Sequence, residues 1–414
     1  MFRNVPFIAL LTVTFVQPAP LADRWSRIVT FYRQRLDQAG VIGSSLIFVK
    51  DGKVIAKAFE GYQDLETRRA VDEDTIYHWA SITKMFTGVA IMQLRDRGLL
   101  SLDDAAMKYV PELRDVYNPY GDMSQVTIRH LMTHSAGFRA STWPWGGDQP
   151  WHPFEPTDWQ QVVAMFPYTK LLFKPGTQYS YSNPGVIFLG RIIEHLSGED
   201  YEVYITKNLL MPLGMTRSFF DRAPYHLLKN RSHSYERNDD GLQEQRFDFD
   251  TGITVSNGGL NAPLGDMAKW LTFLIGHANP EIGSAQNRTL SDTVLKQSSL
   301  EEMFTPQIRA KEGEGGSGDE VKAGLSCFIE RHHGIELIGH SGNQNGFISH
   351  VYLHRPSKSG YIVSFNTNAQ SKTNARRNTR AVDNELRDLI IKELFHERAD
   401  PNGGPDTDNV VRRR

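Results

Sequence analysis

The 414-residue chain has almost no cysteine and almost no net charge. Cys327 is the single cysteine, so no disulfide can form within the chain and no zinc site can be built from cysteine ligands. The chain has 46 basic and 48 acidic residues, so it lacks the cationic surplus that indicates a nucleic-acid partner. A hydrophobic content of 40% indicates instead a globular protein with a large core.

Long apolar runs are also missing, except at the start of the chain. Arg3 precedes an apolar run of about a dozen residues, and prolines and small residues follow up to Ala22. This pattern is typical of a secretory signal, whereas a membrane span needs roughly 20 apolar residues. We therefore expect residues 1–22 to be a signal peptide of a secreted or periplasmic protein, with no stable membrane span after leader removal. An uncleaved anchor is the alternative.

Strand patterns occur at both ends of the chain and helical patterns between them. Residues 45–50 and 53–59, joined by Asp51-Gly52, predict a β-hairpin, and further strands are predicted at 323–330, 335–339, 347–354 and 361–366. Periodicity predicts helices over 23–39, 185–196, 263–274 and 379–395. We expect an α+β fold in which both chain ends form one antiparallel sheet flanked by helices, with a mostly helical subdomain inserted.

The same patterns define the expected domain organisation. Residues 23–399 form a single catalytic domain, with a sheet subdomain from about 23–80 and 320–396 and a helical subdomain from about 81–319. Residues 400–414, rich in Pro, Gly and Asp, predict a disordered tail. The oligomeric state is not predicted.

The stretch Trp79-Ala-Ser-Ile-Thr-Lys-Met-Phe-Thr-Gly88 contains a candidate nucleophile. Apolar residues at three- and four-residue spacing predict a buried helix from about Ser81 to Arg97, ended by Gly98. Ser81 and Lys84 then share one face of its first turn. A neighbouring base and free helix amides favour nucleophilic catalysis by a serine. A plain helix cap is the alternative, although a capping box would have Glu or Gln at position 84.

Tyr181 and Asn183 form a second candidate group in Tyr179-Ser-Tyr-Ser-Asn-Pro-Gly185, just before a predicted helix. A tyrosine acts as a base only where cations hold it as a phenolate, and Lys84 is the cation we expect there. The Asn183 amide can accept from an ammonium and donate to a substrate carbonyl. A turn with asparagine at a helix start is the structural alternative.

The third candidate group lies on a predicted strand in Ile338-Gly-His-Ser-Gly-Asn-Gln-Asn-Gly346. It comprises His340, Ser341 and Gly342. A glycine lets a substrate approach the strand backbone closely, and a strand edge presents amides that can bind an oxyanion. A tight turn would explain the glycines equally well. Trp143 and Trp145, in a segment rich in Trp, Pro and Gly, are candidates for lining the substrate pocket or for packing.

These three segments, in this order, resemble the penicillin-recognising serine hydrolase superfamily over nearly the whole chain after the leader. The resemblance is strongest to the class C β-lactamase-like branch, which also contains esterases, D-aminopeptidases and carboxypeptidases. That branch is marked by Ser-x-x-Lys, Tyr-x-Asn and a Lys- or His-x-Gly strand. Residues 127–138, 211–216 and 258–267 are also similar to the family.

The resemblance implies a role for each candidate. Ser81 would be the acyl-accepting nucleophile and Lys84 its activating neighbour. Tyr181 would be the general base, although the division of this role between Lys and Tyr is debated for such enzymes. Asn183 would position Lys84 and the substrate amide. The backbone amides of Ser81 and Asn343 would form the oxyanion hole, with no metal or organic cofactor.

The departure from the family pattern is His340, where antibiotic-hydrolysing members have Lys. A histidine titrates near neutrality, so it would supply the cation only partly and in a pH-dependent way. This favours an esterase or D-amino-acid peptidase acting on a small ester, amide or peptide. A β-lactamase or penicillin-binding carboxypeptidase is the alternative, and a catalytically silent binding protein of the same fold is a third interpretation.

The sequence contains two rival candidate sites. Ser135, in Thr133-His-Ser-Ala-Gly137, resembles an α/β-hydrolase nucleophile, but that motif must follow a strand, and residues 127–132 predict a short helix. His130 and His134, which are four residues apart, are candidate metal ligands, as are His332 and His333. The chain has no His-Glu-x-x-His, however, and no third ligand can be named. His134 is better interpreted as a structural hydrogen-bonding residue near the site.

Overall fold

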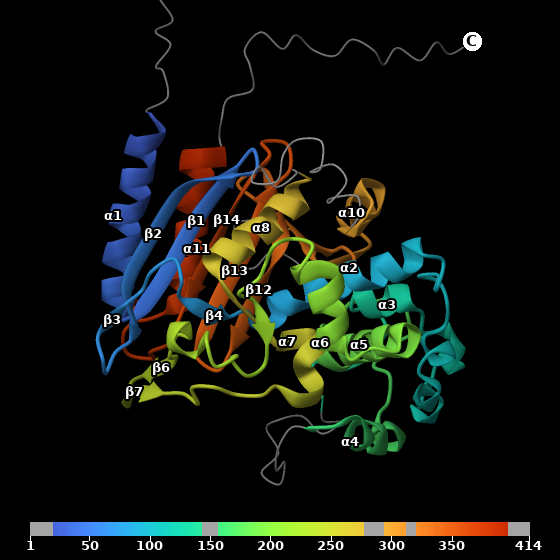
Figure 1. The fold of residues 1–414 in the computed structure, drawn as a ribbon. Helices are drawn as coiled ribbons and strands as arrows, with labels where there is room; N and C mark the ends of the chain where they lie inside the picture. Colours follow the sequence, from blue (N-terminus) through green and yellow to red (C-terminus); the bar gives the residue numbers. More distant parts are fainter. Residues whose placement is uncertain (1–19, 143–155, 277–293, 312–319, 396–414) are drawn as a thin grey trace, which may run out of the picture.

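The computed structural model describes residues 20–142, 156–276, 294–311 and 320–395 (Figure 1). The loop with Trp143 and Trp145, the tail 400–414 and most of the expected signal peptide lie outside the described residues. None of the described helices combines the length and the apolar character that a membrane span requires.

One large antiparallel sheet organises the described residues and is built from both chain ends, as the sequence predicts. It has nine strands. In spatial order these are β3 Arg69–Ala70, β2 Lys53–Asp64, β1 Gly43–Lys50, β14 Ser359–Phe365, β13 Phe347–His354, β12 Ile335–Gln344, β11 Phe328–His332, β10 Val321–Ala323 and β9 Ile308–Lys311. The α+β fold predicted from the sequence is therefore confirmed.

Helices cover the two faces of this sheet and build the helical part beside it. They are α1 Leu21–Ala39, α2 Thr83–Asp96, α3 Ile128–Met132, α4 Trp159–Ala164, α5 Asn183–Ser197, α6 Tyr201–Ile205, α7 Val255–Gly258, α8 Leu264–Ile275, α10 Gln297–Met303 and α11 Thr379–Ile390. Two π-helical turns, Thr206–Leu210 and Ile391–Phe395, continue α6 and α11. Figure 1 shows α1 and α11 together along one face, while α8 crosses the other beside the helical part.

The apolar side chains of the strands point alternately to the two faces of the sheet, so they belong to two hydrophobic cores. In β1, Leu46 and Phe48 belong to the core under α1 and α11, whereas Ile47 and Val49 belong to the core that contains α2, α5 and α8. Successive side chains of a strand point to opposite faces, so one strand serves both cores. The larger core surrounds α2, whose Phe86 ring stacks on Trp270 with ring centroids 3.7 Å apart. Helix α2 is thus held rigidly, which matters because it carries Lys84.

Two small sheets connect the large sheet to the helical part. One contains β4 Ile76–His78, β8 Leu260–Pro263 and β5 Phe219–Phe220 in the order β4-β8-β5, and the other contains β15 Thr367–Ala369, β6 Tyr235–Asn238 and β7 Gly241–Glu244. Strand β4 leads directly into the segment with Ser81. The Trp79 N–H donates to the Leu260 carbonyl at 2.8 Å, and its indole N–H donates to the Ala262 carbonyl at 2.9 Å. These bonds anchor the chain just before the candidate nucleophile.

The structure corrects several predicted boundaries. The strand predicted over 323–330 is two strands, β10 and β11, because residues 324–327 turn between them and Ser326 has a φ of 61°. β12 continues past the predicted end to Gln344 and includes the whole third candidate group. β9 extends the sheet subdomain to residue 308, earlier than about 320. The predicted hairpin at Asp51-Gly52 is confirmed, with φ of 49° and 73° at these residues.

Candidate active site

Ser81 lies in a 3-10 turn, Ala80–Ile82, immediately before α2, rather than within the α-helix predicted from residue 81. Ala80 has a φ of 47°, a conformation that costs a non-glycine residue roughly 1–2 kcal/mol. This strained turn directs Ser81 out of the core, so its side chain is partly exposed while its neighbours Ala80 and Ile82 are buried. The predicted end of the helix is confirmed, since Gly98 has a φ of 75°.

Three of the predicted side chains meet at the Ser81 hydroxyl. Lys84 Nζ lies 2.9 Å from Ser81 Oγ, and the Tyr181 hydroxyl lies 2.9 Å from the same oxygen. Lys84 reaches Ser81 from the next turn of the same chain segment, whereas Tyr181 arrives from the segment just before α5. Lys84 Nζ is also 5.1 Å from the centre of the Tyr181 ring. The arrangement places a nucleophile in contact with two groups that can exchange protons with it.

The second partner of Lys84 is a backbone atom. Lys84 Nζ donates to the Asn257 carbonyl oxygen at 2.9 Å. The hydrogen bond expected from Asn183 to Lys84 is not made in the described residues, and the Asn183 Oδ1 is buried with no hydrogen-bond partner there. Asn183 is the first residue of α5, and its own N–H donates to the Ala140 carbonyl at 3.2 Å. The carbonyl of Asn257 therefore takes the positioning role that the resemblance gave to Asn183.

Burial shifts both Lys84 and Tyr181 towards their uncharged forms. Lys84 is only 1% exposed, and burial lowers its pKa well below the usual value. Burial also raises the pKa of Tyr181 well above 10, and the hydrogen bond between Tyr181 and Ser81 opposes this shift only in part. Burial penalises the charged form of each group, so it shifts the balance towards the uncharged lysine and the protonated phenol.

His340 is buried behind the site and uncharged. It is 2% exposed, and burial together with the nearby Lys84 lowers its pKa to about 3. Its Nδ1 lies 2.6 Å from the Ser341 carbonyl, which fixes the proton on Nδ1, and its Nε2 is buried without a partner among the described residues. The expectation that His340 carries partial charge near neutral pH is therefore wrong, because the sequence cannot show its burial.

Aromatic rings from His134 and Phe328 pack around Tyr181. The ring of His134 lies 4.5 Å from that of Tyr181, and Phe328 stacks at 6.5 Å. His134 Nδ1 accepts from the Ser182 N–H at 3.1 Å, so the prediction that His134 is a structural hydrogen-bonding residue is confirmed. Phe328 was not predicted, since a strand phenylalanine looks the same whether it packs in a core or beside a site.

Strand β12 lies directly against the turn that carries Ser81. The two-residue turn Asn345-Gly346, with φ of 50° and 81°, joins β12 to β13. In such a hairpin the closing pair, here Gln344 and Phe347, exchanges hydrogen bonds, and hydrogen-bonded pairs then alternate with pairs that are not hydrogen-bonded. Asn343 and Ile348 form a pair that is not hydrogen-bonded, so the Asn343 N–H points away from β13. Pairing with β11 ends at Gly339. The Asn343 N–H therefore faces the open edge, as an oxyanion-binding amide would.

Position 342 requires a glycine because neighbouring parts of the chain leave no room for a side chain. A Cβ at this position would lie 2.3 Å from the Trp79 carbonyl oxygen and 2.6 Å from Ser349 Oγ. The space predicted to admit substrate at Gly342 is thus occupied by the backbone that precedes Ser81. Ser341, its neighbour, is partly exposed, so its side chain is accessible to a ligand.

Replacing Gly342 by alanine is expected to reduce stability by about 1–3 kcal/mol, because backbone atoms cannot move aside as a flexible side chain can. It should also reduce activity, since β12 must shift away from Ser81. Gly265→Ala is the matched control: its Cβ would meet nothing within 4 Å, and it lies in α8. Urea unfolding of both variants measures the effect, and equal stabilities would contradict the close approach.

The two rival sites receive no support from the geometry. Residues Ile128–Met132 form the predicted short helix, and the Ser135 hydroxyl contacts the Thr133 hydroxyl at 2.8 Å rather than a base. His130 Nδ1 accepts from the Thr127 N–H in a helix cap. Among the described residues, no three His, Cys, Asp or Glu side chains gather in a group that could hold a metal ion.

The fold and the Ser-Lys-Tyr group together define a β-lactamase/transpeptidase-type serine hydrolase architecture, and comparison with known proteins agrees. The family described as Beta-lactamase matches residues 28–385, so the chain belongs to the Beta-lactamase family, whose members are serine hydrolases. It is 27% identical to "Protein flp" of Staphylococcus aureus over 348 residues, 84% of this chain and 64% of that protein. The chain thus spans somewhat less than two thirds of the length of this curated relative.

Solved structures share the fold. The octameric penicillin-binding protein homologue from Pyrococcus abyssi superposes with a TM-score of 0.71 at 28% identity, covering 90% of this chain and 77% of that one. The D-amino acid amidase from Ochrobactrum anthropi SV3 superposes with a TM-score of 0.70 at 20% identity, covering 92% of this chain and 100% of the amidase. Class C β-lactamases are also among the structures with this fold.

Proposed function

We propose that this protein hydrolyses a small ester or amide through an acyl-enzyme on Ser81, and that it acts as an esterase or D-amino-acid peptidase rather than as a β-lactamase. The observation that carries this proposal is the contact of Ser81 Oγ with both Lys84 and Tyr181 at 2.9 Å. No organic cofactor or metal enters the scheme. As the leader pattern at residues 1–22 favours, the protein would work outside the cytoplasm.

Acylation begins with the uncharged Lys84 amine. Its N–H donates to the Asn257 carbonyl, which leaves the lone pair free to take the proton of Ser81 as Oγ attacks the substrate carbonyl carbon. The carbonyl oxygen becomes an oxyanion, which the N–H groups of Ser81 and Asn343 stabilise. The scissile bond then breaks, the leaving oxygen or nitrogen takes the Tyr181 proton, and Lys84 returns a proton to Tyr181.

Deacylation repeats these steps with water as the nucleophile. Water attacks the acyl carbon and gives a proton to Lys84 through Tyr181, and Ser81 Oγ leaves and recovers its proton. The acid product is released, and both protein groups return to their uncharged states. Asn183 Oδ1, buried without a partner among the described residues, is available to accept an N–H from an amide substrate.

The uncharged His340 supports the choice of substrate class. Where β-lactam hydrolysis needs a permanent cation for the substrate carboxylate, this chain offers a buried imidazole with a pKa of about 3. A substrate with a carboxylate beside the reacting carbonyl would lose hydration there without gaining an ion pair. Neutral acyl groups avoid this cost. The D-amino acid amidase of the same fold is a precedent for amide cleavage, and its substrate class enters this proposal by analogy alone.

A substrate panel tests the proposal. We expect p-nitrophenyl acetate and butyrate, or D-amino-acid p-nitroanilides, to be hydrolysed at least tenfold faster in kcat/KM than a chromogenic cephalosporin. Intact-mass analysis after treatment with a fluorophosphonate should show one adduct on Ser81. Preference for the cephalosporin would contradict the substrate class. Absence of both turnover and adduct would favour a silent binding protein.

A further inference from the structure

A cavity lies between the end of β2 and the segment that precedes β6. Its volume is about 840 Å³. Three cationic side chains line it, Arg69, Lys229 and Arg231, together with the apolar surfaces of Tyr225, Leu228 and Phe247. None of the proposed catalytic residues lines it. We call it the Arg231 cavity.

Arg231 is the unusual residue of this cavity. It is 1% exposed, and all three guanidinium nitrogens are buried without a hydrogen-bond partner among the described residues. Its guanidinium carbon lies 5.6 Å from the Phe249 ring and 5.1 Å from the Phe347 ring. Aromatic faces stabilise a cation, but they accept none of its five N–H donors. A guanidinium keeps its charge in proteins. Asp248 acts on this charge from nearby but accepts no hydrogen bond from it among the described residues, so the donors still lack an acceptor, a role that an anion would fill.

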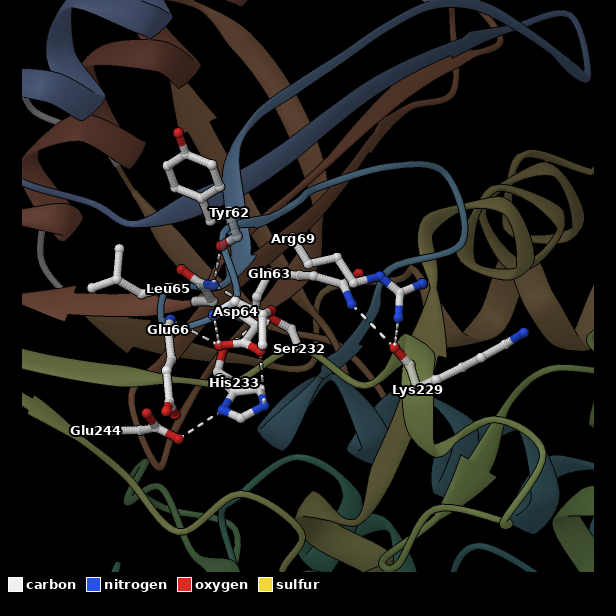
Figure 2. Close-up of polar contacts among 12 residues, drawn as sticks. Tyr62, Gln63, Asp64, Leu65, Glu66, Arg69, Lys229, Ser232, His233 and Glu244 are labelled. Carbon is white, nitrogen blue, oxygen red and sulfur yellow. Dashed lines mark hydrogen bonds and ion pairs between the residues drawn. The ribbon is translucent and has the colours of Figure 1, made fainter.

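Several other polar groups around the cavity have partners among the described residues, as Figure 2 shows. The Lys229 carbonyl accepts from Gln63 Nε2 at 3.2 Å and from Arg69 Nη1. His233 Nδ1 lies 2.6 Å from Glu244 Oε1, and its Nε2 lies 3.9 Å from Asp64 Oδ2. The Asp64 carboxylate also accepts from the Thr67 hydroxyl and from the Glu66 N–H at 3.0 Å. The Arg231 guanidinium differs from these groups, because its three buried nitrogens have no such partner among the described residues.

The charge of the walls restricts the ligand further. Arg231 and Lys229 attract an anion, whereas Asp64 lines the same cavity and repels a second negative charge. The planar fork of a guanidinium matches the two oxygens of a carboxylate. Tyr225, Leu228 and Phe247 provide an apolar surface, and the volume exceeds what a bare anion needs. Together, the cationic residues, the Asp64 carboxylate and the apolar surface favour a monocarboxylate with an apolar body.

We propose that the Arg231 cavity binds a small monocarboxylate whose carboxylate pairs with Arg231 and whose apolar or aromatic body packs on Phe247 and Tyr225. The site is separate from the Ser81 group and does not depend on the proposed hydrolysis. It would respond to an acid ligand even if Ser81 formed no acyl-enzyme.

Calorimetric titration of phenylacetate into the full-length Ser81→Ala protein tests the proposal, because this variant excludes acylation. We expect phenylacetate to bind about 10- to 100-fold more tightly than the neutral phenylacetamide, the usual range for a charged hydrogen-bonded pair. Phenyl phosphate should bind more weakly than phenylacetate because of Asp64. Arg231→Met should remove the preference for phenylacetate, and Arg231→Lys should retain part of it.

Stability and ligand position are measured independently of these variants. Arg231→Met replaces an unpaired buried charge by an apolar chain of similar length, so it is expected to fold with an unchanged or higher Tm. Should it fail to fold, crystals of the wild-type protein with 4-bromophenylacetate locate the ligand by the anomalous signal of bromine. A carboxylate on Arg231 supports the proposal. Equal binding of acid and amide, unchanged binding to Arg231→Met, stronger binding of phenyl phosphate, or bromine outside the cavity would overturn it.

Discussion

Ser81→Ala is expected to reduce kcat/KM by about 10⁵-fold or more, the loss typical of removing a serine nucleophile whose base remains in place. The hydroxyl oxygen is the one atom that contacts both Lys84 and Tyr181. Without it no covalent intermediate forms, and the fluorophosphonate adduct should disappear from the intact mass. Initial rates on p-nitrophenyl butyrate and mass spectrometry measure the two effects.

The same substitution should leave the fold intact. Lys84 keeps its hydrogen bond to the Asn257 carbonyl, and only the Tyr181 hydroxyl loses its partner, which costs about 1–3 kcal/mol. For a domain of this size such a change lowers Tm by only a few degrees. Ser135→Ala is the matched control, because Ser135 is the rival nucleophile and its hydroxyl contacts the Thr133 hydroxyl. Loss of activity in Ser135→Ala with retention in Ser81→Ala would reverse the assignment.

Elements with a local signal were predictable from sequence. The hairpin β1–β2 follows from Asp51-Gly52, which adopts the positive φ angles that such a turn requires. Helices α5 and α8 follow from their apolar periodicity and lie within two residues of the predicted bounds. The division of β10 from β11 has no such signal. Contacts distant in sequence cause it, since Leu325 N–H donates to Met303 and Ser326 N–H to Met132.

The candidate site shows the same limit. Ser81, Lys84 and Tyr181 are chemically distinctive residues at recognisable spacing, and the structure brings them together. The partner of Lys84 is instead the carbonyl of Asn257, an atom that every residue possesses, so no pattern could indicate it. The charge of His340 was mispredicted for a related reason: it depends on how deeply β12 is buried beside Lys84, which is a property of the fold.

Lys84→Met and Tyr181→Phe are expected to have large but unequal effects. If Lys84 is the base, Lys84→Met should reduce kcat/KM by about 10³- to 10⁴-fold and Tyr181→Phe by about 10²- to 10³-fold, the range for general acid–base groups. Because both act on the same oxygen, the double variant should lose no more than about tenfold beyond Lys84→Met. Multiplicative losses would show that the two groups work independently.

The pH dependence separates the two candidate bases. Lys84 accepts a proton only when uncharged, so activity should fall as the pH drops through its lowered pKa, well below 10.5. A Tyr181 phenolate would instead require pH values above 10, because burial raises its pKa. Tyr181→Phe should therefore retain the limb of the kcat/KM profile that lies well below pH 10. A limb that appears only above pH 10 and disappears in Tyr181→Phe would assign the base to tyrosine.

Stability provides a second measure of the Lys84 pKa that does not depend on turnover. The unfolded chain binds a proton at Lys84 below pH 10.5, whereas the folded protein binds it only below its lowered pKa. Between these two values the wild type should lose about 1.4 kcal/mol of stability relative to Lys84→Met for each unit that the pH falls, and nothing further below them. Urea unfolding between pH 6 and 10.5 measures this difference. A flat difference would mean that Lys84 remains an ammonium in the folded protein, and the phenolate of Tyr181 would then become the base.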